Sequence, residues 1–452
     1  MNIIIAGGGK VGTTLVRQLS GEGYDLTIID NDQAVVDAVT ERYDIMGMVG
    51  NCASMPVLLQ AGIREADLLI ATTNEDEVNL LCCTTAHGLN PNLHTIARIR
   101  NPEYSDQIYA LRDVFALSLS INPEKQAARE IERLLKLPGF LHRETFAKGR
   151  TQIVELRIDG SSKLCNVPLS ALPGIVKCSV LVCAVLRSGN AMTPSGTFVL
   201  REGDRIFVTA PTNNLTVLLK NLGIITRRVR RVMICGGGRV SYYLAELLQK
   251  DGISTCLVER DEERCRQLCE LLSDVEIICG DCADPNTLEE NGLQDCDALV
   301  TATSIDEMNM IVSLYGASRN VPQIITKLGR GDNRGVVDSL QLGSVVCPKE
   351  LCCNNITRYV RAMQNQTGAA VSVHAIADGQ AEAVEFLVEE GTAHCGEPLK
   401  KIKLRPNVLL VSITHGAQTQ IPNGESMFHV GDTIVAVTSR RGMLMQLNDI
   451  FA

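Results

Sequence analysis

The stretch NIIIAGGGKVG, residues 2–12, decides the fold of the first part of the chain. The apolar run predicts a buried strand, the glycines predict a turn, and the residues that follow predict a helix. Gly7, Gly9 and Gly12 have the G-x-G-x-x-G spacing. This spacing lets a turn close tightly, a pyrophosphate approach the backbone, and a helix pack against its strand.

A second predicted strand, YDLTIID, ends at Asp30. Its carboxylate would accept hydrogen bonds from ribose hydroxyls and repel a 2′-phosphate. A phosphate would lie at the start of the helix that contains Lys10 and Val11, where free backbone N–H groups and the helix dipole favour an anion. We therefore expect NAD or a plain adenine nucleotide rather than NADP.

The pattern returns in the second half as VMICGGGRVS, residues 232–241, followed by STCLVE, residues 254–259. Gly236 and Glu259 keep the interval that separates Gly7 and Asp30. The remaining predicted binding residues of this second turn are Gly238, Arg239 and Val240. Matches continue to the end of the chain, so we interpret the sequence as a duplication of one two-lobed unit.

Composition excludes several classes of protein. A net charge of −9 argues against nucleic acid and against an anionic lipid surface as partners. No apolar run reaches the roughly 20 residues that span a bilayer, and the N-terminus does not resemble an export signal. We therefore expect a soluble cytoplasmic protein, with no nucleic acid and no direct membrane insertion.

The 17 cysteines then indicate reduced thiols. Cys279 and Cys282 have metal-ligand spacing, but the sequence lacks a second such pair or a nearby histidine, so we expect no metal site.

Strands and helices alternate through residue 122, which predicts a parallel, doubly wound sheet whose last strand is Val114–Leu119. A strand-rich, turn-punctuated segment follows, which predicts a small α+β lobe. The expected fold is α/β, with two Rossmann-like sheets that are each followed by such a lobe. The predicted parts are nucleotide-binding domains at 1–122 and 227–348, crossover helices at 123–140 and 349–366, and small lobes at 141–226 and 367–452.

The sequence resembles the TrkA family, the NAD-binding peripheral subunits of Trk potassium uptake systems, which are built from tandem RCK (regulator of potassium conductance, or KTN) domains. The resemblance spans the chain. It rests on the glycine turn, Asp30, GNCA at 50–53, TTNEDEVN at 72–79, ARIRNP at 97–102 and the repeat of large and small lobes.

The resemblance implies a cytoplasmic ring, usually of four chains, that docks on a membrane-embedded potassium transporter at the inner face of the cell membrane. Nucleotide binding would change the shape of the ring and gate ion flow. A ligand achieves this only by binding one conformation more tightly than another.

The resemblance also assigns further site residues. Asn51 and Cys52 would contact adenine, with Asp281 and Cys282 as their counterparts, and Thr72, Thr73 and Asn74 would border the phosphates and distal ribose. Arg98 and Arg100 would hold phosphate, or would instead pair with nearby acids.

The second copy departs from the pattern. Ser241 replaces the third glycine, Lys327 replaces Arg98, and Gly329 replaces Arg100. The second site would then prefer ADP or ATP, or would be weak or empty.

Two other functions remain open. An NAD-dependent oxidoreductase needs an acid or base beside the cofactor, yet the chain has no Tyr-x-x-x-Lys motif and its histidines are scattered. A hydroxyl residue for Mg²⁺ does not follow Lys10, so ATP hydrolysis is not indicated. We favour a sensor that is not an enzyme, and a regulator of a potassium efflux channel is the other alternative.

Overall fold

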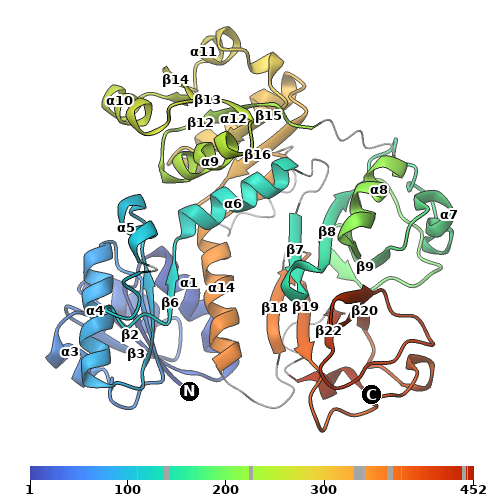
Figure 1. Cartoon of the computed structure of the whole chain (residues 1–452), viewed down its shortest axis with the longest axis horizontal. Coiled ribbons are helices and arrows are strands. Elements are labelled where there is room, and N and C mark those ends of the chain that lie inside the picture. The colour runs from blue at the N-terminus through green and yellow to red at the C-terminus, as the bar shows by residue number, and fades with distance from the viewer. Residues whose placement is uncertain are drawn as a thin grey trace. The chain divides into compact units, whose positions relative to one another are not determined.

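The computed structural model describes residues 1–108, 110–136, 142–222, 228–329, 340, 342–363, 370–377, 379–439, 444 and 446–452. The helices and strands of the chain are labelled in Figure 1. The chain divides into two compact units. One unit contains Met1–Arg129 and Cys347–Thr357, and the other contains Glu130–Val346 and Arg358–Ala452.

The first unit contains a six-stranded parallel sheet with order β3-β2-β1-β4-β5-β6. We call this domain N1 (residues 2–121). Its strands are β1 (Asn2–Ala6), β2 (Asp25–Asp30), β3 (Met46–Val49), β4 (Leu68–Ala71), β5 (His94–Arg98) and β6 (Leu119–Ile121). Its helices are α1 (Lys10–Leu19), α2 (Gln33–Thr40), α3 (Met55–Gln60), α4 (Asp76–Leu89) and α5 (Pro102–Gln107). The strand order reverses between β1 and β4, which is where open α/β sheets bind ligands.

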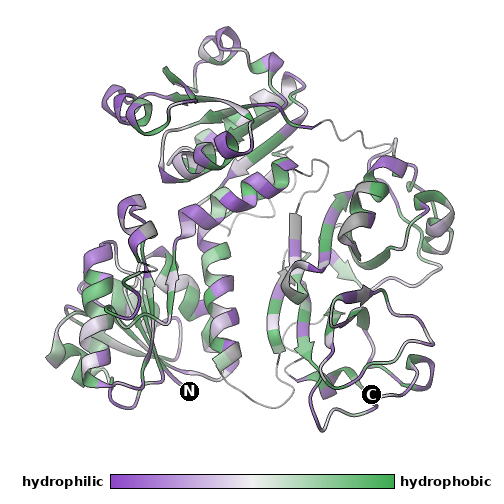
Figure 2. Cartoon of the chain, viewed as in Figure 1, coloured by the Kyte–Doolittle hydropathy of each residue, from purple (hydrophilic) through white to green (hydrophobic). Residues whose placement is uncertain are grey.

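Burial of the central strands explains the sheet. Ile3 to Ala6 in β1 and all of β4 are almost completely buried, as expected for parallel strands that are covered on both faces. Figure 2 shows these strands coloured mostly as hydrophobic, while the helices contain both hydrophobic and hydrophilic residues.

The second unit repeats this sheet with order β14-β13-β12-β15-β16-β17. We call this domain N2 (residues 231–346). Its strands are β12 (Arg231–Cys235), β13 (Ser254–Glu259), β14 (Glu276–Cys279), β15 (Ala298–Thr301), β16 (Gln323–Lys327) and β17 (Ser344–Val346). Its helices are α9 (Arg239–Lys250), α10 (Glu262–Leu271), α11 (Pro285–Glu290) and α12 (Asp306–Ser318). The predicted duplication of the large domain is confirmed.

Two small lobes, C1 (residues 142–222) and C2 (residues 370–452), each have a five-stranded sheet. The elements of C1 are β7 (His142–Phe146), β8 (Thr151–Arg157), α7 (Leu172–Val176), β9 (Leu181–Arg187), β10 (Asn190–Met192), β11 (Arg205–Pro211) and α8 (Thr212–Leu222). The strands of C2 are β18 (Ala370–Ile376), β19 (Ala381–Leu387), β20 (Val408–His415), β21 (Gln418–Gln420) and β22 (Thr433–Thr438). A buried cluster that includes Phe146 and Phe207 of C1 and Val411 and Val435 of C2 joins the two lobes.

A buried carboxylate is held in the same place in each small lobe by different residues. Asp204 of C1 accepts two hydrogen bonds from the guanidinium of Arg187, both of 2.7 Å. In C2, Nδ1 of His415 lies 2.5 Å from Oδ1 of Asp432. The arginine of C1 is thus a histidine in C2.

Two helices connect the large domains to the small lobes, and each is shared between the units. Helix α6 (Pro123–Lys136) begins in the first unit, but its last turns belong to the second, where Nε2 of Gln323 donates to the carbonyl of Leu134 (2.9 Å). Helix α14 (Pro348–Met363) follows N2, but its first turns belong to the first unit, where Thr357 donates to Gln18 on α1 (3.1 Å). The helix that follows each large domain therefore belongs in part to the unit that contains the other large domain.

The predicted strand Val114–Leu119 is wrong. Residues 111–116 form turns, Ala116 has a positive φ of 52°, and the strand β6 starts only at Leu119. Leu117 belongs to the core of N1 and Phe115 packs against it, whereas Val114 is exposed. The predicted boundaries at 140/141, 226/227 and 366/367 lie outside the described residues.

Candidate nucleotide-binding sites

The glycine turn of N1 joins β1 to α1 with three different steric requirements. Gly7 has φ +98°, and a Cβ there would lie 2.8 Å from the backbone nitrogen of Thr73. A Cβ at Gly12 would lie 1.9 Å from the carbonyl oxygen of Gly7. A Cβ at Gly9 would meet no described atom within 4 Å. Gly7 and Gly12 are therefore required by the fold, whereas Gly9 leaves open space above the start of α1.

Asp30 holds the other side of this turn. Its carboxylate accepts hydrogen bonds from the backbone N–H groups of Gly8 (2.6 Å) and Asp32 (3.0 Å). The carboxylate is half-buried beside the glycines. The N-terminus of α1 has no side-chain cap at Gly9, so its free N–H groups can receive an anion.

The loop after β4 is held by a fully buried asparagine, Asn79 of α4. Its Oδ1 accepts from the backbone N–H and the hydroxyl of Thr73, both at 2.8 Å. Its Nδ2 donates to the carbonyls of Thr73 (3.2 Å) and Arg98 (2.9 Å). The amide thereby joins the ends of β4 and β5. The hydroxyl of Thr72 lies below the turn, where it donates to the carbonyls of Ala6 and Gly7.

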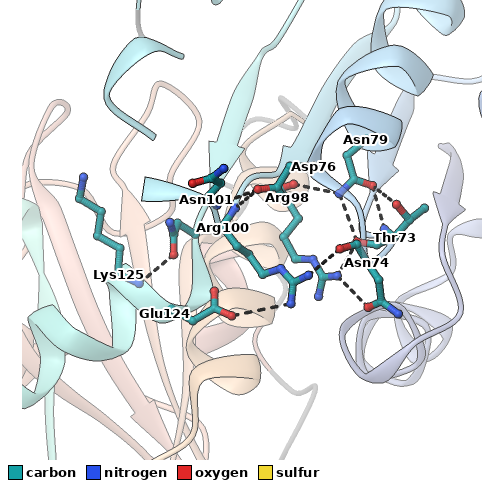
Figure 3. A network of polar contacts seen from close by, with 10 residues as sticks. Thr73, Asn74, Asp76, Asn79, Arg98, Arg100, Asn101, Glu124 and Lys125 are labelled. Carbon is teal, nitrogen blue, oxygen red and sulfur yellow. Dashed lines mark hydrogen bonds and ion pairs between the residues drawn. The ribbon is translucent and has the colours of Figure 1, made fainter. Parts of the chain in front are cut away.

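Two arginines leave β5 beside this loop, as Figure 3 shows. Nη2 of Arg98 donates to the carbonyl of Thr73 and to Oδ1 of Asn74, and Nη2 of Arg100 donates to the carbonyl of Asn74 (2.6 Å). Arg98 is only 7% exposed, and its Nε has no hydrogen-bond partner among the described residues. Burial lowers the pKa of Arg98, as does the charge of Arg100, while Glu124 and Asp76 oppose this.

The predicted adenine loop follows β3. The side chain of Asn51 closes a local turn by accepting from the N–H of Ala53 (2.9 Å) and is exposed. Cys52 is buried, and the thiol of Cys82 donates to its carbonyl (3.1 Å). A hydrogen bond with Cys82 lowers the pKa of the Cys52 thiol. Only Asn51 of this pair presents its side chain to solvent.

The second copy reproduces the framework. Gly236 has φ +99°, and a Cβ at Gly238 again meets no described atom within 4 Å. The carboxylate of Glu259 accepts from the N–H groups of Gly237 and Asp261. Asn309 is fully buried and makes the same four hydrogen bonds to Thr303 and Lys327 that Asn79 makes in N1. Asp281 closes the loop after β14 through the N–H of Ala283 (2.8 Å), and Cys282 is buried.

Three contacts differ between the copies. The carbonyl of Gly8 accepts from the hydroxyl of Thr13 (2.8 Å), whereas that of Gly237 accepts from Nε of Arg264 (2.8 Å). Ser241 is fully buried, and its hydroxyl has no partner among the residues that the structure describes. Nζ of Lys327 takes over the bond of Arg98 by donating to the carbonyl of Thr303 (2.6 Å).

The structure thus brings the predicted residues of each copy to one end of the parallel sheet. These residues are Gly7, Gly9, Lys10, Val11, Gly12, Asp30, Asn51, Cys52, Thr72, Thr73, Asn74 and Arg98 in N1, and Gly236, Gly238, Arg239, Val240, Glu259, Asp281 and Cys282 in N2. The sequence analysis did not assign Asn79 and Asn309. Their repetition beside Thr73 and Thr303 was the available signal.

Within the described residues, no three acidic, histidine or cysteine side chains lie together in a way that could hold a metal ion. In that same part of the chain, no helix is both long and apolar enough to cross a membrane.

Comparison with protein families gives one consistent match. The TrkA-N domain matches residues 3–116 and 232–348, and the TrkA-C domain matches residues 153–223 and 383–451. The Trk system potassium uptake protein TrkA homolog of Archaeoglobus fulgidus is 30% identical over 452 residues, which cover 100% of both chains. The TrkA protein of Vibrio alginolyticus is 29% identical over 100% of this chain and 98% of its own.

Solved structures agree on the fold. The crystal structure of the GsuK RCK domain has a TM-score of 0.62 at 18% identity, covering 96% of this chain and 92% of its own. The GsuK channel bound to NAD has a TM-score of 0.61 at 18% identity, covering 97% and 76%. The predicted architecture of paired Rossmann-like and small RCK lobes is confirmed.

Proposed function

Because this chain belongs to the TrkA family of Trk potassium uptake systems, we propose that it is the nucleotide-sensing regulatory subunit of such a system. NAD or NADH would bind N1, and an adenine nucleotide, ADP or ATP, would bind N2. Occupancy would shift the conformation of an assembly of several chains, usually four, on a membrane-embedded potassium transporter. The chain would thus act in the cytoplasm, at the inner face of the membrane.

The observation that carries this proposal is the open space above Gly9 and Gly238, next to an uncapped helix N-terminus and a carboxylate. The fold itself does not require glycine at these two positions, since a Cβ would meet no described atom within 4 Å. A glycine that the fold does not need is explained by a pyrophosphate that must reach the backbone.

In N1, Asp30 would accept hydrogen bonds from the ribose hydroxyls, and the loop of Thr73 and Asn74 would border the phosphates. The guanidinium of Arg98 supports a phosphate contact, because it is buried and its Nε has no hydrogen-bond partner among the described residues. An anion would stabilise such a buried cation strongly. In N2, Lys327 is a point charge that cannot form the bidentate contact of an arginine. We therefore expect the two sites to differ in ligand preference.

Replacing Gly9 by alanine tests the site without disturbing the fold. Gly9 has φ −65° and ψ −167°, which alanine adopts readily. The added methyl group would occupy the space of the pyrophosphate, so we expect NADH affinity at N1 to fall by about 10-fold or more, or about 1.4 kcal/mol. Isothermal titration calorimetry of the full chain with NADH measures this.

Gly21→Ala is the matched control, because a Cβ at Gly21 also meets no described atom within 4 Å and lies outside the turn. Gly238→Ala should instead change only the second binding step, titrated with ATP or ADP. Unchanged NADH affinity in Gly9→Ala, with the variant folded, would overturn the site assignment. Potassium uptake by cells that contain the transporter should change in the same variants, whereas an oxidoreductase would consume NADH with a small substrate.

A further inference from the structure

A carboxylate at the start of α6 faces the two arginines of N1. Nη1 of Arg100 lies 3.9 Å from Oε1 of Glu124, and both side chains are about one-fifth exposed, at 21% and 20%. The same guanidinium donates through Nη2 to the carbonyl of Asn74. Arg100 therefore connects the loop after β4 with the first turn of α6 (Figure 3).

Glu124 is poorly satisfied in this position. Its Oε2 is buried and has no hydrogen-bond partner among the described residues. The other nearby carboxylate, Asp76, is occupied differently, because its Oδ2 accepts from the backbone N–H groups of Arg100 (2.8 Å) and Asn101 (2.7 Å). Asp76 thus fixes the end of β5, although its buried Oδ1 also lacks a hydrogen-bond partner among the described residues. Both carboxylates offset the charge of Arg98, but the ion pair with Arg100 is made by Glu124.

The second copy has neither partner of this contact. Proline begins both linking helices, at Pro123 and Pro348, so the position of Glu124 corresponds to Lys349, and Arg100 corresponds to Gly329. A carboxylate in N1 is thus a cation in N2, and the arginine is lost with it. Because the two sites share the glycine turn, the carboxylate beside it and the buried asparagine, this difference points to a role that only N1 has.

We propose that Glu124 is a coupling residue: it competes with the phosphate of a bound nucleotide for Arg100, so that ligand binding in N1 frees the first turn of α6. This rests on the proposed function, in which N1 binds a nucleotide. A phosphate and a carboxylate both bind the guanidinium fork, and a phosphate carries more charge and more acceptor oxygens.

The place of Glu124 in the chain gives this competition a consequence. The first turns of α6 belong to the first unit, and the residues from Glu130 onward belong to the second. When phosphate breaks the contact between Arg100 and Glu124, the first turn of α6 is released. This helix leads from N1 to the next part of the chain.

Glu124→Gln tests the competition, because the amide keeps the shape of the side chain and removes its charge. We expect NADH to bind N1 about 5-fold more tightly in this variant, or about 1 kcal/mol. In the Arg100→Gln background the gain should vanish, which a double-mutant cycle measured by calorimetry detects. Glu132→Gln further along α6 is the control, and it should leave N1 affinity unchanged.

Hydrogen exchange separates coupling from a simple charge effect. In the natural chain, NADH should lower the protection of amide groups at residues 124–128, and in Glu124→Gln these amides should show the bound-state protection without ligand. Equal or weaker binding by Glu124→Gln, or an affinity gain that persists without Arg100, would overturn the proposal. If Gly9→Ala still abolishes binding in that case, the proposed function stands and only the coupling fails.

Discussion

Replacing Gly12 by serine is expected to abolish nucleotide binding by N1 and to lower the free energy of unfolding of this domain by about 3 kcal/mol or more. The added Cβ would lie 1.9 Å from the carbonyl oxygen of Gly7 and 3.0 Å from its carbonyl carbon. Both are backbone atoms of the turn between β1 and α1, so α1 would have to move away from the sheet. Calorimetry with NADH, together with hydrogen exchange of β1 and β4 amides, measures both losses.

The reciprocal change in the second copy is the control. Ser241 stands at the same position, is fully buried, and has no partner for its hydroxyl among the described residues. Ser241→Gly would remove a buried unsatisfied group that costs about 1–3 kcal/mol and introduce a helical glycine that costs up to about 1 kcal/mol. We expect little net loss. A Gly12→Ser chain that folds and binds NADH normally would show that close packing at Gly12 is not required.

Arg187→Ala should destabilise C1 by about 3–5 kcal/mol at neutral pH, because it leaves a buried carboxylate without its partner. Asp204 is 1% exposed, and besides Arg187 it accepts only from the backbone N–H of Arg201 (2.8 Å) among the described contacts. Urea denaturation of the full chain, followed by hydrogen exchange of β11, measures the loss.

The pH dependence of this loss has a definite sign. Burial by itself would raise the pKa of Asp204, but the hydrogen bonds and charge of Arg187, with the Arg201 amide, hold it below its ordinary value. The pair therefore stabilises C1 above about pH 4 and loses this effect as pH falls through the lowered pKa. The difference between Arg187→Ala and the natural chain should narrow below about pH 4, and a difference that stays constant would contradict the assigned role.

The residues that form the glycine turn could be predicted because the requirement at each position is local in the sequence. Gly7 needs a positive φ, Gly12 needs close packing, and Asp30 needs only to end a strand beside the turn. The duplication was predictable for the same reason, since two turns with the same spacing fix two sheets.

What escaped prediction depends on contacts between distant segments. The hydrogen bonds of Asn79 require β4 and β5 to be neighbours in the sheet. Arg264 replaces Thr13 as the side-chain donor to the carbonyl of the glycine turn only because α10 lies beside the second turn. The strand expected at Val114–Leu119 was wrong because residues 114–116 form a turn and only Leu119 belongs to β6. Hydrophobic pattern alone cannot separate these uses in a segment this short.

Because α6 and α14 are each shared between the two units, cutting the chain between its two halves has a predictable effect. Fragments 1–222 and 228–452 would each carry a helix whose buried side finds its place on the other fragment, and their small lobes would share one apolar core. We expect two such fragments, when produced together, to reassemble, whereas either one alone would expose apolar surface and associate with itself. Because both halves are in a single polypeptide, they are always present in equal amounts, and each half always has its partner half.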